Sequence, residues 1–211
     1  MTISGQRIER MITRIVLATN NKYKIREIKN IWVDLPVEIL TLKDFPGFPK
    51  VEETGRNFEE NAIIKATAIC GFTNLPSVAD DSGLEVDALD QAPGVLSSRF
   101  AGEHCSFQDN NRKLLQLMQE IPLEKRRAKF VCVVALAKNL DRIVTVRGEV
   151  KGIITSEEKG VNGFGYDPVF YLPHLNRTFA QLTLEEKNKI SHRAQAFGKA
   201  KELIQKGFLY A

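Results

Sequence analysis

Short runs of apolar residues recur along this chain, and polar loops or helical periods separate them. Residues 15–18, 77–79 and 130–137 are runs of strand length. The third run (FVCVVALA) is unbroken, which is typical of a central strand that is covered on both faces. Residues 143–150 alternate between apolar and polar positions, as expected of an antiparallel neighbour. The pattern predicts a sheet at the centre of the fold.

The first predicted helix follows the first strand and carries its apolar residues on one face: Ile25, Ile28, Ile31 and Trp32. Three further helices are predicted where a Ser, Thr or Asn precedes an acidic residue by three positions, which is the pattern of a capping box. These pairs are Asn57 with Glu60, Ser106 with Asp109, and Thr183 with Glu186.

The strand that begins at residue 77 is expected to stop at Ser82-Gly83, because these residue types favour a turn, and a second short strand is expected over residues 84–88. The order of elements predicts an α/β fold in which helices flank a mixed sheet, and not a regular doubly wound sheet. Residues 1–13 are polar and lack the apolar segment of a signal peptide, so we expect a flexible N-terminal extension. Residues 14–211 are then expected to form a single domain.

Composition narrows the class of protein. The formal net charge of +4 fits an anionic small ligand at least as well as a nucleic acid, whose binding domains usually carry a stronger basic stripe. The three cysteines are odd in number and widely spaced, which argues against a disulfide framework or a zinc site and favours a reducing cytoplasm. No apolar stretch approaches the roughly 18–20 residues that a membrane span needs. We therefore expect neither a membrane nor a stable nucleic-acid partner.

Two pairs of neighbouring carboxylates are candidates for a metal site, namely Asp80-Asp81 after a strand and Glu52-Glu53 before a helix. Adjacent carboxylates repel each other unless a cation or a basic group lies between them, and their oxygens suit a divalent metal that activates water. The alternative for Asp80-Asp81 is an acidic turn with solvated side chains. The alternative for Glu52-Glu53 is a favourable interaction with the helix dipole. Neither pair decides the function by itself.

Two loops contain residues suited to a nucleotide. Residues 19–24 lie between a strand and a helix, where backbone N–H groups and Lys24 favour an anion, although a capped turn without a ligand explains the same residues. Residues 160–168 contain three glycines within six positions, which lets a backbone approach a ligand closely. Phe164 and Tyr166 in this loop are suited to stacking on a flat heterocycle, or to folding inward in a tight loop.

The C-terminal segment holds Lys187, Ser191, His192 and Arg193 close together in sequence. On one unbroken α-helix, Lys187 and Arg193 would point about 240° apart and could not contact the same ligand. If both contact it, the helix must break near Ser191, which then caps the second half. His192 alone is equally typical of a surface histidine.

Five motifs occur in order along the chain: Thr-x-Asn-x-x-Lys, Glu-Glu-Thr-Gly, Ala-Asp-Asp-Ser-Gly, Gly-Phe-Gly-Tyr-Asp-Pro and Glu-Lys-x-x-x-Ser-His-Arg. Through them the chain resembles, from Ile15 to the last helix, the inosine/xanthosine triphosphate pyrophosphatase family, which removes non-standard purine nucleotides. The segment from Phe58 to Ala62 (Phe-x-Glu-Asn-Ala) resembles the bacterial branch. The resemblance implies an elongated α/β fold with a long central sheet, two lobes, a cleft between them and usually a homodimer. It also implies Mg²⁺-dependent hydrolysis of dITP, ITP and XTP to the monophosphate and pyrophosphate.

The same resemblance implies roles for residues of this chain. Asp81, helped by Asp80, is expected to be the general base on water and to hold Mg²⁺ together with Glu52, with Glu53 as the second choice. The residues expected to bind substrate are Thr19, Asn20, Asn21, Lys22, Tyr23, Lys24, Lys65, Ser82, Phe164, Gly165, Tyr166, Asp167, Lys187, His192 and Arg193. In this scheme the loop of residues 19–24 contacts the triphosphate, Phe164 stacks on the base, and the C-terminal residues read the purine edge.

Position 20 is Asn where bacterial members of that family often have Gly, which alters the loop backbone but removes no charge. Three other functions are consistent with parts of the sequence: a nucleic-acid-binding module, a nucleotide-binding regulator without catalysis, and a pyrophosphatase for modified pyrimidine nucleotides. The carboxylate pairs disfavour the first, because they repel phosphate without a metal. The presence of Asp81, Glu52 and Lys24 disfavours the second. The Ser-His-Arg segment disfavours a pyrimidine nucleotide pyrophosphatase, because the family that it resembles acts on purine nucleotides.

Overall fold

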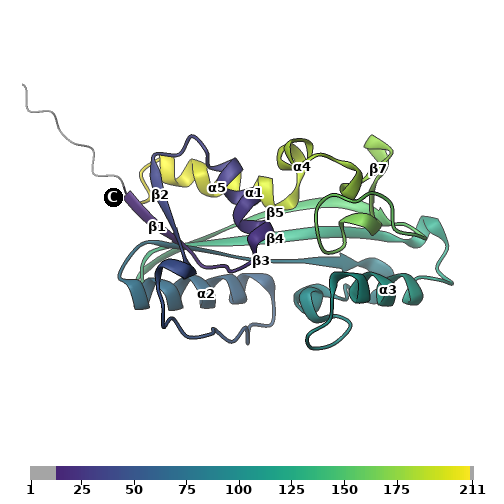
Figure 1. Ribbon diagram of the computed structural model, residues 1–211, viewed down its shortest axis with the longest axis horizontal. Coiled ribbons are helices and arrows are strands. Elements are labelled where there is room, and N and C mark those ends of the chain that lie inside the picture. The colour runs from purple at the N-terminus through teal and green to yellow at the C-terminus, as the bar shows by residue number, and fades with distance from the viewer. Residues whose placement is uncertain (1–12, 210–211) are drawn as a thin grey trace, which may run out of the picture.

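The computed structural model describes residues 13–209 of the chain, and its centre is a seven-stranded sheet in the order β2-β1-β3-β4-β5-β6-β7 (Figure 1). The strands are β1 (Thr13–Leu17), β2 (Val37–Thr41), β3 (Ser77–Val86), β4 (Arg127–Asn139), β5 (Arg142–Ile154), β6 (Phe170–Leu172) and β7 (Arg177–Thr178). β1 pairs in parallel with β2 and β3, whereas the pairs from β3 to β7 are antiparallel. The predicted α/β fold with a mixed sheet is confirmed.

Helices cover both faces of this sheet. They are α1 (Lys22–Ile31), α2 (Phe58–Thr73), α3 (Phe107–Leu117), α4 (Leu184–Ile190) and α5 (His192–Gln205). α1, α4 and α5 lie on one face, and α2 and α3 lie on the other (Figure 1). The three predicted caps are confirmed, because Asn57, Ser106 and Thr183 each accept a hydrogen bond from the backbone N–H three residues later.

Two expectations concern the N-terminal extension and a membrane span. The extension predicted over residues 1–13 lies outside the described residues except for Thr13, which begins β1 and pairs with Val37. Among residues 13–209, no helix is both long enough and apolar enough to cross a membrane.

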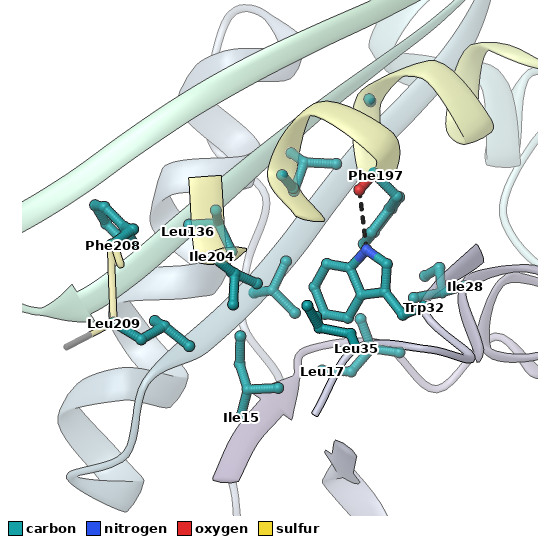
Figure 2. Close-up of a cluster of buried hydrophobic side chains, with 14 of the residues drawn as sticks. Ile15, Leu17, Ile28, Trp32, Leu35, Leu136, Phe197, Ile204, Phe208 and Leu209 are labelled. Carbon is teal, nitrogen blue, oxygen red and sulfur yellow. Dashed lines mark hydrogen bonds between the residues drawn. The ribbon is translucent and has the colours of Figure 1, made fainter. Parts of the chain in front are cut away.

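β4 is buried on both faces, as its unbroken apolar sequence predicted. Val134 packs in the core under α1 and α5, where the Trp32 indole N–H donates a 2.9 Å hydrogen bond to the Phe197 carbonyl oxygen (Figure 2). Val133, the neighbouring residue, packs in a second core under α2. The alternation of side chains along a strand thus divides one apolar run between two cores.

β3 does not end at Ser82-Gly83, so the predicted turn at this point is wrong. The strand continues to Val86 and pairs with β4 along its whole length. A Cβ atom at Gly83 would lie 2.4 Å from the Gly94 carbonyl oxygen and 2.8 Å from the Phe58 ring. Glycine is needed here because neighbouring segments pack closely against the strand, and not because the chain turns.

The long strands β3, β4 and β5 run along the molecule and join two groups of elements (Figure 1). The first group, with β1, β2, α1, α2 and α5, packs around the two cores that contain Val133 and Val134. The second group, with α3, β6 and β7, packs around a separate core that contains Leu114 and Phe170. We call these groups the first and the second lobe.

A cleft forms where β1 ends. β1 pairs with β3 only at Ser77 and Val78, so the edge of β3 beyond Val78 is not covered by β1. Residues of both lobes line a cleft of about 720 Å³ at this edge. Asp80 and Asp81 of β3 are among them.

Candidate active site

Most of the residues predicted to bind substrate or metal line this cleft. The exceptions are Lys22, Tyr23 and Glu52. The lining comes from segments far apart in the sequence: the loop after β1, the middle of β3, the glycine-rich loop of residues 160–168, α4 and the start of α5. The five motifs therefore meet at one site.

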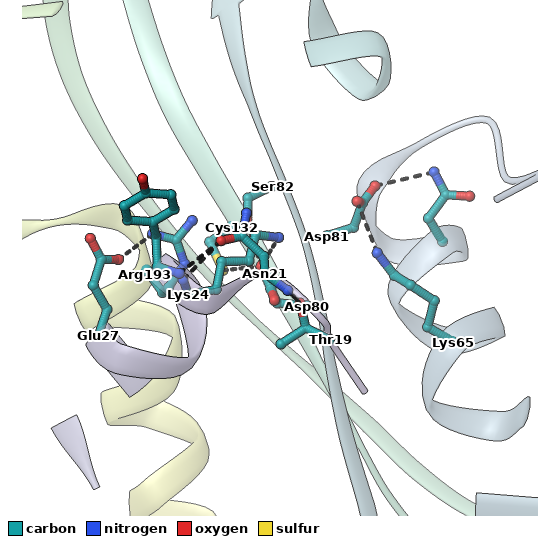
Figure 3. A network of polar contacts seen from close by, with 12 residues as sticks. Thr19, Asn21, Lys24, Glu27, Lys65, Asp80, Asp81, Ser82, Cys132 and Arg193 are labelled. Carbon is teal, nitrogen blue, oxygen red and sulfur yellow. Dashed lines mark hydrogen bonds and ion pairs between the residues drawn. The ribbon is translucent and has the colours of Figure 1, made fainter. Parts of the chain in front are cut away.

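Asp80 and Asp81 point to opposite faces of the sheet, because they are neighbours in β3 (Figure 3). Asp80 Oδ2 accepts a hydrogen bond from Lys24 Nζ at 2.7 Å on the α1 side. Asp81 Oδ1 accepts one from Lys65 Nζ at 3.1 Å on the α2 side. The expectations of an acidic turn, and of two carboxylates around one shared cation, are both wrong. Each carboxylate has its own lysine.

Side chains of α2 hold Asp81 in place. Asn61 Nδ2 donates to Asp81 Oδ2 at 3.1 Å, and the Lys65 ammonium that contacts Oδ1 also donates to Glu53 Oε1 at 2.8 Å. Burial raises the pKa of Asp81 above its ordinary value, the charge of Lys65 opposes this rise, and the charge of Glu53 adds to it. A raised pKa makes the ionised carboxylate a better proton acceptor.

Glu53, and not Glu52, faces the site. Glu53 lines the cleft, whereas Glu52 is exposed and is not among the lining residues. Asn61 was missed from the sequence, although it belongs to the Phe-x-Glu-Asn-Ala motif. Its Oδ1 accepts a 2.8 Å hydrogen bond from the Gly55 N–H, so one side chain ties the Glu-Glu-Thr-Gly loop to Asp81.

Asp80 is a buried anion. Lys24 Nζ and Ser82 Oγ both donate to its Oδ2 atom. Burial by itself raises the pKa of Asp80, but the neighbouring positive charges, led by Lys24 and Arg193, outweigh burial and hold this pKa well below its usual range. Its other oxygen, Oδ1, is buried without a hydrogen-bond partner in the part of the chain that the structure describes.

The loop after β1 is a capped turn, as one interpretation of the sequence expected. Asn21 Oδ1 accepts hydrogen bonds from the backbone N–H groups of Tyr23 at 3.0 Å and Lys24 at 3.2 Å. The Asn21 N–H donates to Thr19 Oγ1 at 3.2 Å. These bonds occupy amides at the start of α1, so the charge that this loop brings to the cleft is that of Lys24. Binding of a triphosphate here stays a prediction.

The helix break predicted at Ser191 is confirmed. α4 ends at Ile190, and Ser191 Oγ accepts a 3.0 Å hydrogen bond from the Ala194 N–H to begin α5. The break brings Lys187 and Arg193, which one straight helix would point in different directions, into one buried cluster.

Glu27 is the centre of that cluster. Lys187 Nζ donates to Glu27 Oε1 at 2.9 Å and to Asp167 Oδ2 at 2.6 Å, and Arg193 forms an ion pair with Glu27 Oε2. All four side chains are at most 4% exposed. Burial by itself raises the pKa of Glu27, but the charges of Arg193 and Lys187 outweigh it, and the pKa is lowered. Burial raises the pKa of Asp167.

Glu27 was also missed from the sequence. It lies beside Ile28 on the buried face of α1, one turn after Lys24. The sequence contained one signal that could have identified it: an acidic residue on the apolar face of a helix, close to a predicted ligand-binding lysine.

His192 is buried and uncharged. Its ring stacks on Phe130, with 4.7 Å between centroids and 8° between planes. Burial, and next the charge of Arg193, lowers the pKa of His192 well below its ordinary value. His192 Nδ1 and Arg193 Nε are buried without hydrogen-bond partners within residues 13–209. Buried polar atoms are normally paired, so the missing partners mark an unusual position in two residues that line the cleft.

Phe164 lies in the wall of the cleft and belongs to a cluster of three aromatic rings. It stacks on Tyr23, with 5.1 Å between centroids and 19° between planes, and lies 6.0 Å from the ring of Phe107. Lys187 Nζ and Arg193 Cζ lie 4.9 Å and 5.3 Å from the Phe164 ring centroid. An aromatic face and hydrogen-bond donors are therefore close together, as binding of a flat heterocycle requires.

The rest of the glycine-rich loop supports Phe164. Gly163 has φ of 76°, and a Cβ atom on it would lie 2.0 Å from Asp167 Oδ2. Glycine thus lets Asp167 accept a 2.9 Å hydrogen bond from the Phe164 N–H. Tyr166 borders the cleft, but it is buried in the core of the second lobe and donates to the Ser97 carbonyl oxygen at 2.9 Å. Of the two aromatics predicted in this loop, Tyr166 is the one that folds inward.

Comparison with known proteins gives the family. The model of the Ham1 family matches residues 15–203. The chain belongs to the Ham1 family. Among its curated relatives, the dITP/XTP pyrophosphatase of Desulforamulus reducens is 48% identical over 197 residues, which cover 93% of this chain and 98% of the relative. The dITP/XTP pyrophosphatase of Geobacter sulfurreducens is 48% identical over 191 residues, which cover 90% and 96%.

Solved structures of the Ham1 family have the same fold. A HAM1 protein from Coxiella burnetii superposes with a TM-score of 0.87 at 41% identity, and the match covers 93% of this chain and all of that one. A nucleoside-triphosphatase / dITP/XTP pyrophosphatase from Mycobacterium abscessus gives a TM-score of 0.73 at 42% identity, over 91% and 98% of the two chains. The family resemblance inferred from the five motifs is confirmed.

Proposed function

We propose that this member of the Ham1 family hydrolyses dITP, ITP and XTP to the nucleoside monophosphate and pyrophosphate, and so removes them from the nucleotide pool. One observation carries the proposal: a single cleft joins a carboxylate–lysine site, Asp81 with Lys65, to an aromatic wall with unpaired buried polar atoms, Phe164 with His192 and Arg193. The names of the curated relatives support the same reaction.

Asp81 is the proposed general base. Its carboxylate is fixed by Asn61 and Lys65, and its raised pKa favours removal of a proton from the attacking water. Lys65 and Lys24 bring positive charge to the cleft, which suits phosphate oxygens whose negative charge grows during attack on phosphorus. Both lysines would exchange a carboxylate partner for a phosphate when the nucleotide binds.

Mg²⁺ is part of the proposal, and the side chains present fit it. Glu53 and Asp81 place carboxylate oxygens on either side of one ammonium group, at a position where a positive charge is already stabilised. No cluster of three or more acidic, His or Cys side chains suited to a metal occurs in residues 13–209. Glu53 and Asp81 would therefore hold the ion together with phosphate oxygens and water, which is the coordination that Mg²⁺ prefers. When bound, the ion would neutralise charge on the phosphate oxygens.

The purine would be selected at the other end of the cleft. Hypoxanthine and xanthine have a keto oxygen at position 6, where adenine has an amino group. The Arg193 Nε–H is buried without a hydrogen-bond partner in residues 13–209, and in this proposal it donates to the keto oxygen. Adenine would leave this donor unpaired at a cost of about 1–3 kcal/mol. Guanine shares the keto group, so its 2-amino group must be excluded by shape or by an unpaired donor.

The test is pyrophosphate release from ITP, dITP, XTP, ATP and GTP, measured in parallel with Mg²⁺ and with EDTA. We expect metal-dependent release from the first three substrates and little from ATP or GTP. Release from all five would contradict the account of the purine edge. No release from any substrate would contradict the enzymatic function. The alternative of a nucleic-acid-binding module would then be tested by the salt dependence of nucleic-acid binding.

The assembly and the location are also proposals. The family resemblance supports a homodimer, which sedimentation at several protein concentrations would test. Cys70, Cys105 and Cys132 are free thiols, which supports a reducing compartment such as the cytoplasm.

A further inference from the structure

Tyr23 belongs to the loop of residues 19–24 in the sequence, but it does not line the cleft, unlike Thr19, Asn20, Asn21 and Lys24. Its ring stacks on Phe164, and it also contacts Phe107 edge-on with 6.2 Å between centroids. The structure thus separates Tyr23 from the residues proposed to contact the triphosphate and places it behind the wall proposed to contact the base.

The neighbours of the Phe164 ring differ in whether they line the cleft. Phe164, Lys187 and Arg193 line the cleft, and the two cationic groups approach the ring there. Tyr23 touches the same ring from outside the cleft lining, and 53% of the Tyr23 surface is exposed. Tyr23 therefore contacts the Phe164 ring without being part of the cleft lining, whereas Lys187 and Arg193 approach the ring from residues that line the cleft.

The contact matters because of the loop that carries Phe164. Gly163 and Gly165 flank the residue with φ of 76° and 64°, and the hydrogen bond from the Phe164 N–H to Asp167 holds the backbone of Phe164 but not its ring. Tyr23 is anchored at the start of α1, where its N–H donates to Asn21 Oδ1. A ring fixed on the first lobe thus restrains a ring on a glycine loop of the second lobe.

We propose that Tyr23 is a positioning residue for base recognition, which holds the Phe164 ring in the orientation on which the purine stacks. The inference rests on the proposed function, because it takes Phe164 as the residue that stacks on the base. Loss of one aromatic pair should weaken binding of the base roughly two- to tenfold. It should leave the binding of a ligand without a base unchanged.

The experiment compares the unsubstituted chain with Tyr23→Ala and Tyr23→Phe, each checked for an unchanged Tm. Calorimetric titration in Mg²⁺ gives the Kd for IMP, which carries the base, and for pyrophosphate, which does not. We expect Tyr23→Ala to raise the Kd for IMP and the KM for ITP roughly two- to tenfold, with the Kd for pyrophosphate and kcat unchanged. Tyr23→Phe keeps the ring and should match the unsubstituted chain.

Three outcomes would overturn the inference: unchanged IMP binding in Tyr23→Ala, an equal loss for IMP and pyrophosphate, or an equal loss in Tyr23→Phe. An equal loss for the two ligands would indicate that Tyr23 contributes to binding of the phosphates and not of the base. If the unsubstituted chain binds IMP but does not hydrolyse ITP, the proposed function fails while the comparison among the three chains still decides the role of Tyr23. No IMP binding by the unsubstituted chain would also overturn the inference, whereas the proposed function would still be decided by pyrophosphate release from ITP.

Discussion

Lys65 Nζ lies 3.1 Å from Asp81 Oδ1, and its charge lowers the proton affinity of the proposed base. Burial raises the pKa of Asp81, and the charge of Lys65 opposes that rise. The same ammonium is held by Glu53 at 2.8 Å, so its position does not depend on Asp81 alone. The pH dependence of the reaction should therefore report on Lys65.

Lys65→Met should move the acid limb of the pH–rate profile to higher pH. The base must be ionised, so the rate falls as the pH drops below the pKa of Asp81. Removal of Lys65 removes a charge that lowers this pKa, and the limb must shift upward. The measurement is kcat/KM for ITP from pH 5 to 9, with Lys29→Met on the exposed face of α1 as the control. An acid limb at the same pH in both variants would contradict the role of Asp81 as base.

Asp81→Asn should reduce turnover of ITP by about 10²–10⁴-fold, which is the usual contribution of a general base. The amide keeps the shape of the side chain and can still pair with Asn61, so the Tm should change little. Asp141→Asn in an exposed turn is the control for the substitution itself. Full activity in Asp81→Asn would contradict the role of Asp81 as general base.

Glu27→Gln should destabilise the protein at neutral pH by about 3–5 kcal/mol, because it removes the carboxylate that pairs with the buried Arg193 and one of the two carboxylates that pair with the buried Lys187. The pKa of Glu27 is lowered in the folded state, so its contribution is present above the unfolded value of about 4.3 and is lost as the pH falls through the folded value. The difference in unfolding free energy between the two chains should therefore narrow below about pH 4.

Urea unfolding at pH 7 and at pH 3.5 measures this difference, and Glu120→Gln on the exposed surface is the matched control. A difference that stays constant between the two pH values would show that the charge of Glu27 contributes nothing to stability.

Arg193→Lys should lower kcat/KM for ITP roughly 10- to 100-fold and change the slow reaction with ATP much less. Lysine keeps the positive charge next to Glu27 but has no equivalent of the Nε–H donor, which the structure leaves unpaired. Parallel kinetics with ITP and ATP check the prediction. An equal loss for the two substrates would mean that Arg193 supports the site without reading the purine edge.

The sequence by itself determined the features that depend on neighbouring residues. The caps at Asn57, Ser106 and Thr183, and the helix break at Ser191, follow from hydrogen bonds that span three or four residues. The unbroken apolar run of β4 marked the centre of the sheet, because a strand buried on both faces has no polar side. The order of the motifs was sufficient to identify the family.

Only the tertiary structure decided which side chains meet. Gly83 resembles a turn residue in the sequence, but it lies within a continuous strand. The Gly94 carbonyl oxygen packs so closely against it that no Cβ atom would fit. Asp80 and Asp81 are adjacent in sequence and are separated by the pleat of β3, so their partners come from different helices. Glu27 and Tyr23 depend on contacts with residues more than a hundred positions away. Such contacts exist only after the lobes have packed, so a local pattern can mark Glu27 as unusual but cannot give its partners.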